Sequence, residues 1–398
     1  MLRDIARIGL SIFSAPDPST GLGEGLSRRD LNRSRKVAFD YLARIERLKA
    51  MMSTHGLDAL LLSVGADLPY FTGYEAMASE RLTVFVITIG SDPVLFVPEL
   101  EAPRVADGHF EVRAWSELDD PVAMAASLLR ADDVVAVGDH MWSAFLMRFA
   151  KTLPHVEWRP GSEVTRELRM RKDPEEIEAL RQAAHAVDRV MARIPSELRF
   201  AGRREREVAH DLAALTLDEG HDVAEFGIVG AGPNGASPHH EPGDRVITDG
   251  DVVVCDFGGR LQGYFSDSTR TFVVGEPDSL ITEVHSAVLD ANRAGRAAVA
   301  PGVPCQEIDR AAREVIEDAG YGELFIHRTG HGIGLEVHEH PYLVKGNEMP
   351  LEVGMTFSVE PGVYLPGRFG VRIEDIVACT ERGDETLNQA SRELVIVS

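Results

Sequence analysis

The sequence predicts an α/β protein made of two domains. The chain has 398 residues, which is more than a single hydrophobic core usually serves. Short apolar runs alternate with helical patterns over roughly the first 160 residues, an arrangement typical of a compact α/β domain. The residues that follow combine long helical patterns with strands bounded by glycine.

The first half of the chain begins with one amphipathic helix and continues with short strands. Apolar residues recur at helical spacing over residues 34–56. Further helical patterns cover 122–129 and 142–153, and β-like runs lie at 59–62, 82–89, 93–97 and 134–137. We therefore expect an N-terminal domain over residues 34–165. Residues 1–33 contain clustered proline and glycine and are expected to form a flexible extension.

A long helix is expected to open the second domain, which we place at residues 166–398. Asp173 can cap this helix, Pro174 occupies its first turn, and Glu175 and Glu176 favour the positive end of its dipole. Long helical patterns cover residues 174–194, 205–219, 281–299 and 305–319. Each of the chemical motifs of the chain falls on a strand or an adjoining loop of this domain.

Composition excludes several classes of partner. The net charge is −23, and such an acidic protein repels nucleic acid and anionic membranes. No run approaches the roughly 18 apolar residues that a membrane span needs. The three cysteines are far apart in the sequence, which argues against a disulfide framework and favours a cytoplasmic location.

Two aspartates mark the first chemical motif. Asp256 follows the apolar run 252–255, and Asp267 precedes a second apolar run that ends at Val274. Gly258 and Gly259 are expected to supply the turn of a hairpin between the two runs. Two buried carboxylates that face one another repel, and a metal ion removes that penalty. The alternative is a pair of aspartates that cap turns.

The second motif is rich in histidine. His327, His331, His338 and His340 lie within fourteen residues, and glycines flank His331. These glycines let the backbone approach a ligand closely and exclude a regular helix. A lone histidine here would be structural, and zinc-type spacing such as HExxH is absent. Four together indicate a functional site.

The third motif contains two glutamates. Glu360 ends one predicted strand, and Arg372 and Glu374 share one face of the next because side chains alternate along a strand. Asp375 points to the other face, as an ordinary ion-pair partner. A salt bridge between Arg372 and Glu374 is the alternative interpretation.

Two Asp, one His and two Glu from the strand ends of one domain suit Mn²⁺, Co²⁺ or Zn²⁺. Four carboxylates around a single ion would leave excess negative charge. Two ions about 3.5–4 Å apart, with carboxylates shared between them, fit this ligand set better.

Together these motifs resemble those of the pita-bread metallopeptidases, in the branch of prolidase and aminopeptidase P. The resemblance covers nearly the whole chain. Residues 172–398 match the pita-bread catalytic domain, and residues 34–160 match a smaller creatinase-like N-terminal domain. The family's motifs occur in the family's order, so the match is specific.

The resemblance implies a ligand for each position of a dinuclear centre. Asp256 would chelate one metal, and His331 and Glu360 would hold the other. Asp267 and Glu374 would bridge the pair. Glu360 would also carry a proton to the leaving nitrogen. Mn²⁺ is the expected metal, with Co²⁺ or Zn²⁺ possible.

It also implies residues that contact the substrate. His239 and His338 would hydrogen-bond the substrate carbonyl and the oxyanion, with His240 the less favoured neighbour of His239. His338 lies seven residues beyond the predicted ligand His331. His327 and Arg372 would line the proline side of the pocket or support the metal shell.

The implied activity is hydrolysis of the Xaa-Pro bond by a metal-bridging hydroxide, most directly in small Xaa-Pro dipeptides. The alternative is an aminopeptidase P, which removes the first residue of longer peptides. Dipeptide selection needs a blocked cleft or a cation that binds the terminal carboxylate. More remote alternatives are a creatine hydrolase, a methionine aminopeptidase and a non-catalytic binding protein. The family also implies a homodimer.

Overall fold

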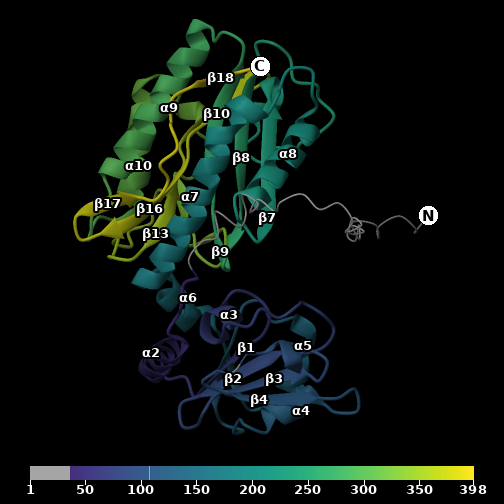
Figure 1. The fold of residues 1–398 in the computed structure, drawn as a ribbon. Helices are drawn as coiled ribbons and strands as arrows, with labels where there is room; N and C mark the ends of the chain where they lie inside the picture. The colour runs from purple at the N-terminus through teal and green to yellow at the C-terminus, as the bar shows by residue number, and fades with distance from the viewer. Residues whose placement is uncertain (1–35, 107) are drawn as a thin grey trace, which may run out of the picture.

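The computed structural model describes residues 36–106 and 108–398, and it arranges them in two lobes (Figure 1). The predicted extension of residues 1–33 lies outside the described residues. The smaller lobe holds the elements up to α6, and the larger lobe holds α7 and everything after it.

The smaller lobe is built on a six-stranded mixed sheet. The strand order is β4-β3-β2-β1-β5-β6. Strands β1, β2 and β3 pair antiparallel, whereas β3–β4, β1–β5 and β5–β6 pair parallel. The strands are β1 (Ala59–Leu62), β2 (Val84–Thr88), β3 (Val94–Pro98), β4 (Glu111–Trp115), β5 (Val134–Val137) and β6 (Glu157–Pro160).

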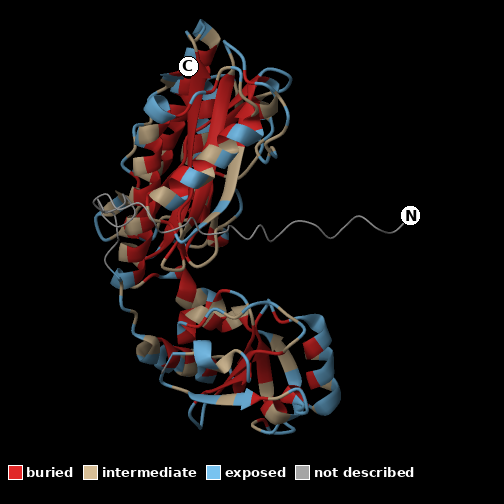
Figure 2. Cartoon of the chain, turned by 45° about the vertical axis from the view of Figure 1, so that its right-hand side comes forward, coloured by how far each residue is buried: buried red, intermediate tan, exposed pale blue. Residues whose placement is uncertain are grey.

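Helices cover both faces of this sheet. Leu60 packs with Leu48 of α2 on one face, and its neighbour Leu61 packs with Phe149 of α5 on the other. This alternation explains why β1 is apolar at every position. Figure 2 shows the buried strands between the partly exposed helices. The helices are α2 (Tyr41–Thr54), α3 (Asp67–Thr72), α4 (Pro121–Ala126), α5 (Ser143–Thr152) and α6 (Ser162–Met170).

The larger lobe contains three sheets. One has the order β18-β10-β8-β7 with β9 beside β8, another has the order β12-β11-β13-β16-β17, and β14 pairs with β15. The strands are β7 (Val223–Ala231), β8 (Val252–Leu261), β9 (Tyr264–Phe265), β10 (Ser268–Val274), β11 (Gly330–Gly332), β12 (Glu339–Leu343), β13 (Thr356–Val359), β14 (Gly362–Leu365), β15 (Phe369–Arg372), β16 (Asp375–Thr380), β17 (Gly383–Thr386) and β18 (Val395–Val397).

Four long helices pack against these sheets: α7 (Pro174–Glu197), α8 (Glu205–Asp218), α9 (Ser279–Ala297) and α10 (Cys305–Asp318). The predicted start of α7 is confirmed. Asp173 accepts a hydrogen bond from the Glu176 backbone, and the Glu176 side chain accepts one from the Asp173 backbone. No helix among the described residues is long and apolar enough to cross a bilayer.

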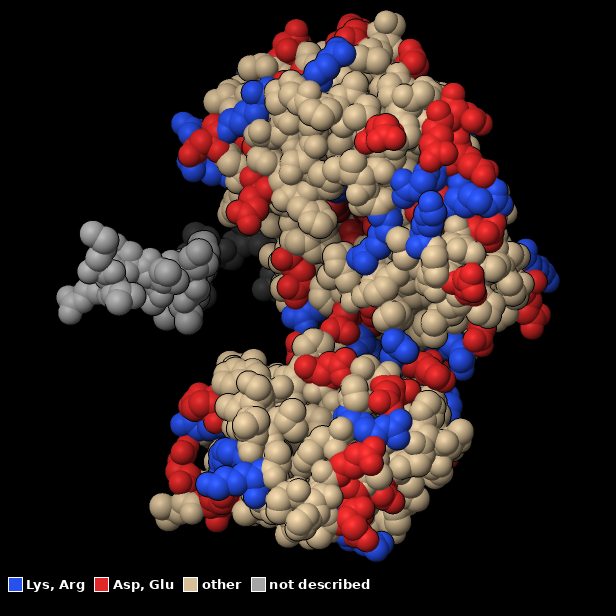
Figure 3. Space-filling model, turned by 180° about the vertical axis from the view of Figure 1, so that it is seen from behind, with Lys and Arg blue, Asp and Glu red and all other residues tan. Residues whose placement is uncertain are grey.

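Charged side chains join the two lobes. Nη2 of Arg44 in α2 lies 3.1 Å from Oδ2 of Asp173. Nη1 of Arg260 in β8 lies 2.6 Å from Oε1 of Glu75. Acidic and basic side chains are interspersed around this junction on the face shown in Figure 3. The side chain of Arg44 in the first of these pairs is buried.

The predicted turn at Gly258 and Gly259 is wrong. Both glycines lie inside β8, and the chain reverses at Gln262 and Gly263, which have φ of 54° and 86°. A Cβ at Gly258 would collide with the Ser266 carbonyl oxygen. These glycines therefore allow close approach between neighbouring segments instead of forming the turn.

Candidate active site

A cavity of about 720 Å³ opens in the larger lobe where several strands end. Its walls carry every residue that the sequence analysis assigned to the site. These are His239, Asp256, Asp267, His327, His331, His338, Glu360, Arg372 and Glu374.

Five of these side chains lie in the strands of two sheets or in the segments that adjoin those strands. Asp256 lies within β8, and Asp267 immediately precedes β10, which pairs with β8. His331 lies in β11, and Glu360 follows β13, its neighbour in the second sheet. Glu374 occupies the link between β15 and β16. The packing of two sheets against each other therefore collects the five groups.

Three of them are close enough to share a metal ion. One potential ligand atom from each of Asp267, His331 and Glu374 lies within 4.8 Å of the others, and all three residues are buried. His331 Nε2 also lies 3.4 Å from a Glu360 carboxylate oxygen.

The orientation of the His331 ring is set by the backbone of the next residue. Its Nδ1 lies 3.1 Å from the Gly332 carbonyl oxygen, an acceptor, so the proton belongs on Nδ1. Burial lowers the pKa of His331 to about 3, which keeps the ring neutral. The lone pair of Nε2 therefore faces carboxylate oxygens, an arrangement that calls for a cation between them.

Two fully buried carboxylate oxygens in the site have no hydrogen-bond partner within residues 36–106 and 108–398. Asp256 Oδ1 and Glu374 Oε1 are buried without one. A buried polar atom left unpaired costs about 1–3 kcal/mol, and more when it is charged. Divalent cations bound in the site would satisfy these oxygens, so the residues present fit a metal centre.

The pKa values of the buried carboxylates also indicate a cation in the site. Burial and then the charge of Glu374 raise the pKa of Asp267 well above its usual range. Burial and then Glu360 do the same to Glu374. Burial raises the pKa of Glu360 to about 7 despite the opposing effect of Arg372. These carboxylates cannot all stay ionised together without compensating positive charge.

Arg372 does not form the alternative salt bridge with Glu374. Its Nη2 donates to Asp256 Oδ2 at 2.6 Å, and its Nε donates to Thr269 Oγ1 at 3.1 Å. Thr269 Oγ1 in turn donates to Glu374 Oε2 at 2.7 Å. Arg372 thus orients one predicted ligand directly and a second one through Thr269.

Tyr364 is a site residue that the sequence analysis missed. Its hydroxyl accepts from Arg372 Nη1 at 2.7 Å and lies 2.9 Å from His327 Nε2. Because His327 Nδ1 donates to the Arg328 carbonyl, Nε2 is the acceptor for the tyrosine hydroxyl proton. A continuous chain of hydrogen bonds therefore runs from His327 to Asp256. The sequence signal that could have identified Tyr364 was its position four residues after Glu360.

The structure separates the two adjacent histidines. His239 lines the cavity, whereas His240 Nε2 lies 2.8 Å from the fully buried carboxylate of Glu205. The ring centroids of His331 and His338 are 4.1 Å apart at an angle of 76°. His338 therefore stands beside the ligand cluster with its side chain open to the cavity.

Arg328 was also missed. Its side chain lines the cavity and its guanidinium lies 4.4 Å from the ring centre of Tyr342. Among the described residues it has no carboxylate partner. An unpaired guanidinium in a cavity wall is suited to bind an anionic group of a ligand.

Comparison with known proteins identifies both lobes. Residues 178–381 match the model of metallopeptidase family M24, and residues 44–171 match that of the creatinase/prolidase N-terminal domain. The two matches confirm the predicted fold class.

Individual relatives cover nearly the whole chain. A probable dipeptidase PepE from Mycobacterium tuberculosis is 43% identical over 90% of this chain and 96% of its own length. An Xaa-Pro dipeptidase from Pyrococcus furiosus is 33% identical over 88% of this chain and 99% of its own. The solved structure of a prolidase from Thermococcus sibiricus has a TM-score of 0.86 and 38% identity, covering 90% of this chain and all of that one.

Proposed function

The chain belongs to metallopeptidase family M24, and from this premise we propose that it is a dinuclear metal-dependent dipeptidase that hydrolyses the Xaa-Pro bond. One observation carries the metal dependence. The lone pair of His331 Nε2 and the unpaired Oε1 of Glu374 belong to one buried cluster of potential ligand atoms, which also includes Asp267. The names of the relatives support the substrate class.

Five residues would hold the ions. Asp256 would bind one ion, His331 with Glu360 the other, and Asp267 with Glu374 would be shared. We propose Mn²⁺ as the metal. When bound, divalent ions supply polarisation of the scissile carbonyl and a lowered pKa for water.

The chain's own residues would then handle protons and charge. Glu360, whose carboxylate oxygen lies 3.4 Å from His331 Nε2, would pass a proton to the proline nitrogen. His338 and His239 line the cavity and would donate to the substrate carbonyl oxygen as negative charge develops there. His327 and Arg372 would form the wall beside the proline ring, and the buried hydroxyl of Tyr364 would hold both of them.

Arg328 supports dipeptides over longer peptides. In a dipeptide the proline carries the terminal carboxylate, which would pair with the free guanidinium of Arg328. A longer peptide presents a neutral amide at that point and loses this ion pair. The cation that dipeptide selection requires is thus assigned to Arg328.

The proposal includes a homodimer and a cytoplasmic location, as the family resemblance and the sparse unpaired cysteines suggest. The activity is tested by comparing hydrolysis of Ala-Pro and Ala-Ala by metal-stripped protein before and after Mn²⁺ is added. We expect Ala-Pro cleavage that depends on Mn²⁺ and little cleavage of Ala-Ala. Metal-independent cleavage, or none of Ala-Pro, would overturn the proposal.

A further inference from the structure

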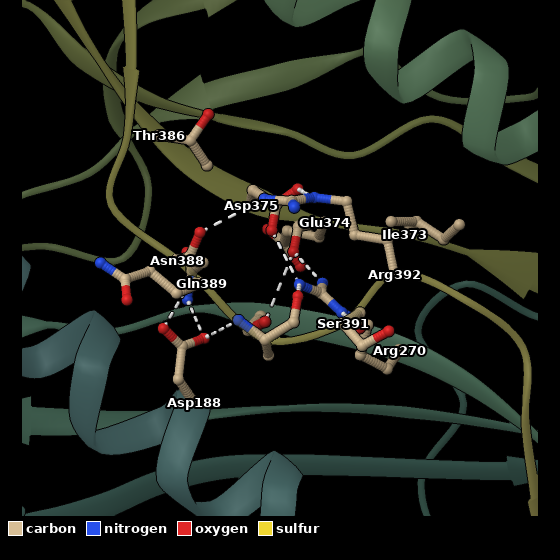
Figure 4. A network of polar contacts seen from close by, with 12 residues as sticks. Asp188, Arg270, Ile373, Glu374, Asp375, Thr386, Asn388, Gln389, Ser391 and Arg392 are labelled. Carbon is tan, nitrogen blue, oxygen red and sulfur yellow. Dashed lines mark hydrogen bonds and ion pairs between the residues drawn. The ribbon is translucent and has the colours of Figure 1, made fainter.

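A buried arginine lies directly behind the predicted bridging carboxylates. Arg270 sits on β10, three residues after Asp267, with only 4% of its surface exposed (Figure 4). Its Nη1 donates to the backbone carbonyl oxygens of Glu374, at 2.6 Å, and of Thr269, at 2.9 Å. Arg270 therefore links the peptide of Glu374 to β10, the strand that Asp267 immediately precedes.

Two further hydrogen bonds also link Glu374 to β10. The Glu374 backbone nitrogen donates to the Thr269 carbonyl at 3.1 Å, and the Thr269 hydroxyl holds the Glu374 carboxylate. Glu374 is thus held at its nitrogen and its side chain by Thr269, and at its carbonyl by Arg270. The spacing of the two predicted bridging carboxylates depends on this strand.

Arg270 is itself held by an anion and by the C-terminal segment 388–392. Its Nη2 donates to Asp375 Oδ1 at 2.8 Å, and Arg392 donates to the other oxygen of the same carboxylate at 2.6 Å. Arg270 also donates to the carbonyl oxygens of Ala390 and Ser391, at 3.1 and 2.8 Å. Asp375 is fully buried, and the two arginines lower its pKa although burial alone would raise it.

The segment 388–392 is anchored on its far side by α7. The carboxylate of Asp188 accepts hydrogen bonds from the backbone nitrogens of Gln389 and Ala390, at 2.6 and 3.1 Å, and from the Asn388 side chain at 3.3 Å (Figure 4). Asn388 Oδ1 accepts from the Ile376 backbone at 2.8 Å. A continuous path of polar contacts therefore leads from α7 to the peptide of Glu374.

We propose that Arg270 is a positioning residue for the metal centre, and that segment 388–392, anchored by Asp188, holds Arg270 in place. This inference rests on the proposed metal site. Shared ligands must keep a fixed separation to bind two ions, and small displacements weaken binding. Outer groups that orient ligands typically contribute about 10–100-fold to metal affinity.

The test is Mn²⁺ affinity, measured by calorimetric titration of metal-free protein without substrate. Arg270→Gln is expected to weaken binding of at least one ion by about tenfold or more. Asp188→Asn, which touches neither a ligand nor Arg270, is expected to weaken it in the same direction by a smaller factor. Asp188→Asn decides the question if Arg270→Gln fails to fold.

Arg193→Gln is the matched control. Arg193 lies on the same helix as Asp188 and pairs with Asp218 at 2.7 Å, away from the cavity. We expect it to lower the melting temperature without changing Mn²⁺ affinity. Wild-type affinity in Arg270→Gln and Asp188→Asn, or an equal loss in Arg193→Gln, would overturn the inference. Failure of the wild type to bind Mn²⁺ would instead contradict the proposed function.

Discussion

Nε2 of His331 lies 3.6 Å from Oδ2 of Asp267, with both side chains buried. The proton of this histidine is on the opposite ring nitrogen, where the Gly332 carbonyl accepts it. The lone pair of His331 Nε2 thus points toward a carboxylate oxygen. A cation bound between these two side chains accounts for this relationship.

Asp267→Ala and Glu374→Ala are each expected to reduce bound metal and to abolish dipeptide hydrolysis, because both residues would be shared between two ions. The measurement is metal content by mass spectrometry beside activity. Glu225→Gln is the control, since Glu225 lines the same cavity outside the ligand cluster and should keep its metal. Full activity in both alanine variants would rule out the assigned ligands.

His338→Ala is expected to lower kcat by about 10²–10³-fold while metal content stays unchanged, because this side chain would stabilise developing charge on the substrate. Steady-state kinetics and metal analysis together check this outcome. His240→Gln serves as control, since His240 pairs with Glu205 outside the cavity lining. Loss of metal from His338→Ala would show that His338 is a ligand.

Metal removal is expected to destabilise the protein more at pH 8 than at pH 5. The folded-state pKa of Glu360 is raised to about 7 by burial, so its contribution to stability is present below the unfolded value near 4.5 and is lost as the pH rises through 7. Asp267 and Glu374 shift in the same direction. Metal binding requires deprotonated ligands and so strengthens over the same range.

Thermal unfolding of metal-free and Mn²⁺-loaded protein at both pH values measures this difference. The melting temperatures should diverge as the pH rises. A gap that is equal at pH 5 and pH 8, or larger at pH 5, would contradict the account of the buried carboxylates.

Arg328→Gln is expected to raise KM for Ala-Pro by about tenfold or more, because a charged hydrogen bond contributes about 1.5–3 kcal/mol. KM for the amide of the same dipeptide should change little. Arg368→Gln, at an exposed arginine outside the cavity lining, is the control. An equal rise for the dipeptide and its amide would show that Arg328 does not bind the carboxylate.

The residues that we propose as ligands could be selected from the sequence because charged residues interrupt apolar strands there. Asp256 follows four apolar residues, and Glu360 follows a buried strand, so each stands out locally. Tyr364 and Arg328 do not stand out from their sequence neighbours in this way. Tyr364 resembles any core aromatic residue in a strand, and its role appears only when Arg372 and His327 are brought against its hydroxyl.

The fold was predictable where periodicity was strong, as in α7 and β1. The fold was less predictable where tertiary contacts determine the backbone conformation. No helical pattern was predicted between residues 62 and 82, yet residues 67–72 form helix α3, which ends at Gly73 with φ of 70°. The edge strands β4 and β6 were not predicted, since their sequences lack clear apolar alternation and pairing with a neighbour defines them.

The most direct test of the central claim is the ratio of kcat/KM for Ala-Pro to that for Ala-Pro-Ala, measured with the Mn²⁺-loaded wild-type protein. A dipeptidase that recognises the proline carboxylate should favour Ala-Pro by about tenfold or more. Comparable or faster cleavage of Ala-Pro-Ala would contradict the dipeptidase proposal and indicate an aminopeptidase P.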